Sequence, residues 1–117
     1  TFKRYEDVRL QCQLYNEGED VMDELLAATP FGNVRMDITN NKIFIHFKYT
    51  KGVFVLSDYK EMLLVWDCII KGLVDSGAKE VFSCISLKDK KLNRFLSMFG
   101  FSPERENKKY IVYRRVL

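Results

Sequence analysis

The sequence contains no long apolar run. No stretch reaches the ~18 consecutive apolar residues that a membrane-spanning helix requires, and no secretory leader is recognisable in it. We therefore expect no contact with a membrane and a cytoplasmic location. Repeats, low-complexity segments and linkers are also absent, and only two prolines occur, Pro30 and Pro103. The 117 residues are therefore expected to form a single domain, residues 1–117, that is large enough for a hydrophobic core.

Metal-binding and nucleotide-binding motifs are also missing. The three cysteines, Cys12, Cys68 and Cys84, do not have the spacing of metal ligands. The sequence therefore predicts three buried thiols in a reducing compartment. It contains no glycine-rich nucleotide loop, zinc motif or calcium loop. No metal cofactor is expected.

Charge is unevenly distributed along the chain. The net charge is +3, but residues 86–117 carry nine Lys or Arg side chains against three acidic ones, a net charge of +6. Such a segment can attract phosphates or an acidic partner. It lacks the aromatic interleaving and the recognition-helix spacing that are typical of nucleic-acid-binding proteins. The sequence therefore favours a protein partner over nucleic acid, with a solvated basic surface as the alternative.

Hydrophobic periodicity predicts a mixture of helices and strands. Residues 6–15 fit a helix or a strand, of which we favour the helix, and residues 17–28 fit a helix that Thr29-Pro30 ends. Strands are predicted at 33–37, 42–49, 53–56, 81–85 and 108–116, and further helices at 58–75 and 89–99. The 53–56 run is continuously apolar, as in a strand covered on both faces. Because a helix separates it from the 81–85 strand, these two strands are predicted to be parallel neighbours in a right-handed βαβ unit.

Two segments resemble a known superfamily. The late helix reads Asp89-Lys-Lys-Leu-Asn-Arg-Phe-Leu-Ser-Met-Phe-Gly-Phe101. It resembles the late helix of the GNAT (Gcn5-related N-acetyltransferase) superfamily, which commonly has Asn, then an aliphatic pair, then Tyr, and closes on Leu-Gly-Phe. Together with Phe54-Val55-Leu56-Ser57-Asp58, this helix is most similar to small acetyltransferase-like proteins of tailed phages, some of which are virion-associated.

The resemblance covers roughly residues 33–116 and implies an α+β fold. That fold has a mixed, mostly antiparallel sheet flanked by helices, with one central parallel βαβ pair. In the superfamily, acetyl-CoA lies between the two parallel strands, and its pyrophosphate sits on the N-terminus of the following helix, where N–H groups and the helix dipole bind anions. The resemblance implies that acetyl-CoA would be bound by five residues: Val53, Val55, Ser57, Lys60 and Asp89.

Three departures from the superfamily pattern affect this cofactor site. The first two turns of the 58–75 helix contain Asp58 and Glu61 but no glycine, and Asp58 as the helix cap would occupy the amides that a phosphate needs. Asp89 stands at the Asn position, and Leu96 stands where the superfamily often has a Tyr that acts as general acid. We therefore predict a degenerate acyl-CoA site that binds acetyl-CoA weakly or not at all.

Two side chains are candidates for acyl-transfer chemistry. His46 is the only histidine, and a neutral imidazole is a suitable general base for an amine nucleophile. Glu61 is the second candidate base, and a structural role is the alternative for both residues.

Two classes of function stay open. In the first, the chain is an acetyltransferase-like, phage-type protein with a degenerate site that acts by association with a virion or host protein, in the virion or the host cytoplasm. In the second, it is an active acyl-CoA-dependent N-acetyltransferase with a relaxed cofactor site. The sequence leaves open whether the chain is an enzyme.

Overall fold

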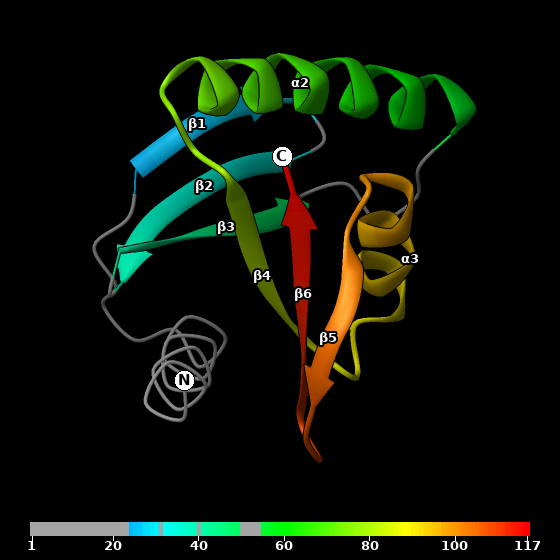
Figure 1. The fold of residues 1–117 in the computed structure, drawn as a ribbon. Helices are drawn as coiled ribbons and strands as arrows, with labels where there is room; N and C mark the ends of the chain where they lie inside the picture. Colours follow the sequence, from blue (N-terminus) through cyan, green and yellow to red (C-terminus); the bar gives the residue numbers. More distant parts are fainter. Residues whose placement is uncertain (1–23, 31, 40, 50–54) are drawn as a thin grey trace.

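The computed structural model describes residues 24–117 except 31, 40 and 50–54, and the statements below refer to these residues. They form one six-stranded sheet and two helices (Figure 1). In chain order the elements are β1 (Glu24–Thr29), β2 (Gly32–Thr39), β3 (Lys42–Tyr49), α2 (Leu56–Asp75), β4 (Glu80–Ser86), α3 (Lys90–Met98), β5 (Ser102–Glu106) and β6 (Tyr110–Val116). Neither helix is long and apolar enough to cross a membrane.

The sheet is mixed and mostly antiparallel. Its strand order is β1-β2-β3-β4-β6-β5, and among these strands only the central pair β3–β4 is parallel. Helix α2 connects these two strands, as a crossover between parallel neighbours requires. The predicted fold class, an α+β fold with one central parallel pair, is confirmed.

The β2–β3 hairpin confirms the strands predicted at 33–37 and 42–49. The two strands are antiparallel, and Val34 pairs with Phe47 in their register. Asn41 in the turn has a φ of +63°, a left-handed conformation that asparagine tolerates better than most residues. Because Val34 and Phe47 are both buried, this register places one face of the hairpin in the core.

The core lies between the sheet and both helices. Phe47 of β3 belongs to the core cluster that includes residues of α2 and α3, whereas the alternating residues Phe44 and His46 lie on the opposite face of the sheet. Trp66 of α2 is 1% exposed, as predicted. Its Nε1 donates a hydrogen bond to the Phe99 carbonyl at 2.9 Å, so this one side chain joins α2 to the end of α3.

Strand β1 corrects part of the helix predicted at 17–28. Residues 24–28 are extended and pair antiparallel with β2, with a bulge between Leu25 and Ala27. The apolar residues of this segment suit a helical face as well as a strand, and pairing with β2 decides between them, because tertiary context overrides local propensity. Residues 17–23 and the helix predicted at 6–15 lie outside the described residues.

The predicted strand 53–56 requires the largest correction. Val55 is the N-cap of α2 and Leu56 is its first residue, while residues 53 and 54 lie outside the described part of the chain. The parallel neighbour of β4 is β3, in which Phe44 pairs with Phe82. A strand covered on both faces would be buried, but Val55 is 54% exposed and Leu56 is 69% exposed. The prediction of a buried strand is therefore wrong for residues 55 and 56.

Strand β5 was not predicted. All five of its residues are exposed, so no apolar alternation marks it, and its Pro103 is tolerated because β5 lies at the edge of the sheet. The positions of β4, α3 and β6 agree with the predicted elements to within two residues at their ends.

The cysteines differ in part from the prediction. Cys68 is exposed and free, so the prediction of a buried thiol is wrong for it. Cys84 is buried, as predicted, and Cys12 lies outside the described residues.

Candidate functional site

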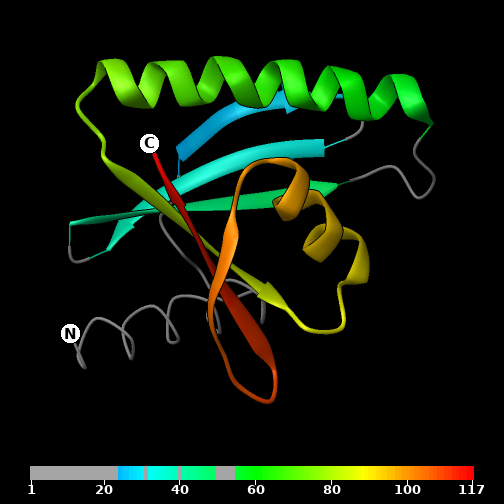
Figure 2. The ribbon, with the colours of Figure 1, turned by 45° about the vertical axis from the view of Figure 1, so that its right-hand side comes forward.

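The β3–β4 pair is joined over a short distance and then opens. One residue pair, Phe44 with Phe82, defines its register. Just beyond it, the Ser83 hydroxyl donates a hydrogen bond to the Ile45 carbonyl at 2.7 Å. The two strands then diverge towards their C-terminal ends (Figure 2). We call this opening the β3–β4 split.

Helix α2 begins without a side-chain cap. The carbonyl of its N-cap residue, Val55, accepts hydrogen bonds from the N–H groups of Asp58 at 3.0 Å and Tyr59 at 3.4 Å. No acceptor among the described residues contacts the N–H groups of Leu56 and Ser57, and both residues are exposed. Within the described part of the chain, these two backbone donors therefore have no acceptor at the positive end of a 20-residue helix.

Asp58 is not the N-cap residue of the helix, contrary to the prediction, but its carboxylate bonds back to the N-cap N–H as in a capping box. It is the third helical residue, it is buried, and its carboxylate accepts a hydrogen bond from the Val55 N–H at 2.9 Å. Because it lies inside the first turn and bonds backwards, it leaves the N–H groups of Leu56 and Ser57 unoccupied. The predicted competition between Asp58 and a phosphate for those amides is therefore absent, although its negative charge remains nearby.

Four predicted cofactor residues lie near helix starts. Val55, Ser57 and Lys60 are exposed at the beginning of α2, and Asp89 is the N-cap of α3. Their roles in binding acetyl-CoA stay predictions. Val53 lies outside the described residues, and Val55 is not on the strand on which its predicted role depended.

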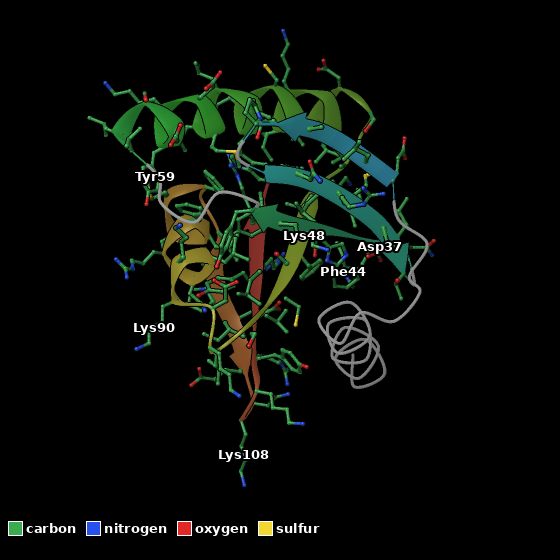
Figure 3. All side chains as sticks on the ribbon, turned by 180° about the vertical axis from the view of Figure 1, so that it is seen from behind. Asp37, Phe44, Lys48, Tyr59, Lys90 and Lys108 are labelled. Carbon is green, nitrogen blue, oxygen red and sulfur yellow. The ribbon has the colours of Figure 1, made fainter. Side chains whose placement is uncertain are left out.

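A pocket of about 430 Å³ lies between the first turn of α2 and helix α3. Its lining combines apolar and basic side chains: Leu56, Tyr59, Lys91, Arg94, Phe95 and Met98. The Tyr59 ring packs edge-on against Phe95, with 5.1 Å between the ring centroids, and Figure 3 shows Tyr59 beside α3. We call this the α2–α3 pocket. Its composition suits a ligand with both an apolar and an anionic part.

Tyr49 and Asp89 connect the split to the start of α3. The Tyr49 hydroxyl donates a hydrogen bond to Asp89 Oδ1 at 3.1 Å, and the same oxygen accepts the Leu92 N–H at 3.1 Å. Burial and this Asp89 carboxylate raise the pKa of Tyr49 above its ordinary value of 10.0. The Lys91 ammonium lies 4.9 Å from the centre of the Tyr49 ring. Tyr49 was not predicted as a site residue, because the parallel partner of the 81–85 strand was predicted at 53–56 rather than at 42–49.

The prediction of a glycine-free phosphate site concerned the first turns of a helix beginning at residue 58. Helix α2 begins at Leu56 instead, and residues 50–54, which include Gly52, lie outside the described residues. The degenerate phosphate site therefore stays a prediction. By contrast, Leu96 at the Tyr position is fully buried in the core, so that position supplies no hydroxyl group.

His46 and Glu61 are not brought together. His46 lies on the face of the sheet opposite α2, is 3% exposed and is paired through its Nε2 with buried Asp37. The Thr39 hydroxyl donates to the other oxygen of Asp37 at 3.0 Å, and Figure 3 shows Asp37 beside Phe44 on this side. Glu61 is exposed on α2. The general-base role of each residue stays a prediction.

The basic residues of the last third do not form one continuous face. Arg114 pairs with Glu80, with 3.4 Å between Nε and Oε1. Arg115 donates a hydrogen bond to the Phe99 carbonyl and lies over the Trp66 ring. Two other groups are separate: Lys91 and Arg94 line the α2–α3 pocket, and Lys108 and Lys109 are exposed at the β5–β6 turn.

Comparisons with known proteins identify the fold. No protein-family model matches the sequence, and no curated protein is significantly similar to it. Among solved structures, the microcin C7 self-immunity acetyltransferase MccE, in complex with acetyl-CoA and AMP, matches with a TM-score of 0.57 at 19% identity, over 74% of this chain and 54% of that chain. The ribosomal-protein-S5-alanine acetyltransferase of Vibrio fischeri matches with a TM-score of 0.55 at 14% identity, over the same shares of the two chains.

A third structure is matched over nearly the whole chain. The N-acetyltransferase PseH of Campylobacter jejuni, in complex with acetyl coenzyme A, has a TM-score of 0.60 at 12% identity, over 99% of this chain and 82% of that chain. The chain therefore has the fold of the GNAT acetyltransferases. It spans about half the length of MccE and of the Vibrio fischeri enzyme.

Proposed function

We propose that this chain is an acyl-CoA-binding domain with the acetyltransferase fold. The CoA phosphates bind between the start of α2 and helix α3, and the thioester arm extends into the β3–β4 split. The observation that carries the proposal is the open start of α2, with two unoccupied N–H groups beside a pocket that contains Lys91 and Arg94. Acetyl-CoA in the MccE and PseH complexes supports the choice of ligand.

The chemistry of the α2–α3 pocket fits this ligand. Helix N-termini bind phosphates because their unpaired N–H groups and the helix dipole both favour negative charge. Lys91 and Arg94 add two cations, while Leu56 and Met98, both exposed, offer apolar surface to an aliphatic arm. The pocket volume, about 430 Å³, lies within the range that is typical of small-molecule sites.

The catalytic positions favour acyl-CoA binding without acyl transfer. Leu96 cannot donate a proton, and His46 is buried against Asp37. A second function, favoured by the same two observations, is association with a virion or host protein without acyl transfer, and it stays a prediction.

Calorimetric titration with acetyl-CoA tests the first function. We expect a dissociation constant below about 1 mM for the unmodified chain. The double variant Lys91→Ala/Arg94→Ala should bind at least about tenfold more weakly, because charge-assisted contacts to phosphate are lost. The matched control is Lys108→Ala/Lys109→Ala, which removes the same charge from the distant β5–β6 turn (Figure 3). Equal weakening by both variants, or no binding by the unmodified chain, would contradict the proposal.

A thiol-release assay tests whether the bound acyl group is transferred. The chain is incubated with acetyl-CoA and a panel of primary amines, and free CoA is measured against time. Transfer predicts CoA release that depends on the amine and is lost in His46→Gln, provided that this variant still binds acetyl-CoA. Acetyl-CoA binding without amine-dependent release would mean that the chain binds the ligand but does not transfer the acyl group.

A further inference from the structure

A hydrogen bond spans the open end of the β3–β4 split. Tyr49 is the last residue of β3, and Asp89 follows the end of β4 by three residues. The hydrogen bond from the Tyr49 hydroxyl to Asp89 Oδ1, at 3.1 Å, therefore joins two segments that the diverging strands separate. Tyr49 packs against the core cluster on the helix side of the sheet, which is the side on which the α2–α3 pocket lies.

Asp89 is held firmly on its own side of the split. Its Oδ1 accepts the Leu92 N–H, and the Asn93 side-chain amide donates to the carbonyls of Ser86 at 3.0 Å and Asp89 at 2.8 Å. The Tyr113 hydroxyl in turn donates to Asn93 Oδ1 at 2.7 Å. Asp89 would keep these connections if Tyr49 turned away, so breaking the Tyr49–Asp89 hydrogen bond leaves the start of α3 intact.

We propose that the Tyr49–Asp89 hydrogen bond is a latch that closes the β3–β4 split, and that the thioester arm of an acyl-CoA displaces it on binding. This inference rests on the proposed function. The latch opposes the arm but not the phosphates, because the α2–α3 pocket is lined by other residues of α2 and α3. Lys91, which lies over the Tyr49 ring, does not depend on the Tyr49 hydroxyl.

Tyr49→Phe removes the latch and keeps the ring. If the hydrogen bond must break before the arm can enter, Tyr49→Phe should bind acetyl-CoA about 2–10-fold more tightly, the range expected for one net hydrogen bond. The matched control is Tyr113→Phe, which removes the other hydroxyl of the same network outside the split, and which should leave the affinity unchanged. Adenosine 3′,5′-bisphosphate, which has no pantetheine arm, should bind equally well to the unmodified chain and to Tyr49→Phe.

Calorimetric titration of both ligands into the unmodified chain, Tyr49→Phe and Tyr113→Phe tests the latch. Tighter acetyl-CoA binding by Tyr49→Phe alone, with unchanged binding of the bisphosphate, supports the latch. Equal acetyl-CoA affinities of Tyr49→Phe and the unmodified chain overturn the latch and leave the proposed function standing. An equal gain in the affinity of Tyr49→Phe for both ligands would likewise overturn the latch and leave the proposed function standing. No binding of either ligand to any of the three proteins overturns the latch and the proposed function together.

Discussion

The two helices of this domain begin in opposite ways. Helix α3 begins at a carboxylate, Asp89, whose Oδ1 accepts one backbone N–H of the helix and one tyrosine hydroxyl. Helix α2 begins at Val55, which has no side chain able to accept a hydrogen bond. The two starts flank one pocket, because residues of the first turn of α2 and residues of α3 line it together.

The backbone donors at the start of α3 are therefore bound within the protein, whereas donors at the start of α2 can bind a ligand. An N-cap carboxylate satisfies backbone donors within the protein and brings a negative charge that disfavours phosphate. An uncapped start leaves its donors to water or to an anion. The first turn of α2 also contains a carboxylate, Asp58, but it accepts the Val55 N–H and leaves the next two N–H groups open. We therefore assign anion binding to the start of α2 and a structural role to the start of α3.

The largest effect is expected where the two helices are joined. Trp66→Ala removes a fully buried ring and its hydrogen bond to the Phe99 carbonyl, and should lower the free energy of unfolding by about 3–5 kcal/mol. The control Leu64→Ala, at a position on α2 that is 67% exposed, should change it by less than about 0.5 kcal/mol. Urea denaturation of both variants measures this, and similar small losses in both would mean that the helices are held separately.

The next effect compares the two caps directly. Asp89→Ala removes an N-cap and the partner of Tyr49, and should lower the free energy of unfolding by about 1–2 kcal/mol. Val55→Ala removes no capping hydrogen bond and should cost less than about 0.5 kcal/mol. Asp89→Asn should restore most of the loss, since an asparagine oxygen also caps a helix. Equal losses for Asp89→Ala and Val55→Ala in chemical denaturation would erase the contrast between the two starts.

A cap added to α2 should have opposite effects on stability and on binding. Val55→Asp places a carboxylate beside the open N–H groups and should stabilise the fold by about 0.5–1 kcal/mol. It should also weaken acetyl-CoA binding by about tenfold or more, because it occupies the phosphate donors and repels the phosphates. Val55→Ser, a neutral cap, should weaken binding less. Thermal melts and calorimetry on the same samples report both effects, and undiminished binding by Val55→Asp would exclude α2 as the phosphate site.

The smallest effect is a dependence of stability on alkaline pH. The pKa of Tyr49 is raised in the fold by burial and by Asp89, so the folded state holds this proton more tightly than the unfolded state does. The contribution to stability is therefore complete below the unfolded pKa of about 10, and it is lost as the pH rises through the higher folded pKa. Urea midpoints at rising alkaline pH should fall more for the unmodified chain than for Tyr49→Phe. Parallel curves would show that Tyr49 does not contribute in this way.

Much of the second half of the fold could be predicted from the sequence, because its helices and strands have strong periodicity. The helix predicted at 89–99 has a high density of apolar residues on one face, and Gly100 after it has a φ of +85°. The errors occurred in segments where the pattern is ambiguous. The segments at 24–28 and 53–56 are short and apolar, and their conformation depends on which strand is available for pairing.

The candidate site was harder to predict than the fold. Its open N–H groups depend on the residue at which α2 begins. Because α2 begins at Leu56 rather than at Asp58, Asp58 accepts the Val55 N–H and does not occupy the N–H groups of Leu56 and Ser57. Tyr49 belongs to no sequence motif, and its proposed role depends on the position at which β3 and β4 separate. Lys91 and Arg94 were recognised only as parts of a basic segment, because the pocket that they line is formed by a helix that is distant in the sequence.

The most direct test of the central claim is a titration of the ¹⁵N-labelled chain with acetyl-CoA, followed by backbone amide NMR. If the start of α2 binds the phosphates, the amides of Leu56 and Ser57 should shift most, together with those near Lys91 and Arg94. The amides of Lys108 and Lys109 should stay in place. Shifts confined to the β5–β6 turn, or an absence of shifts at Leu56 and Ser57 at a saturating ligand concentration, would contradict the account.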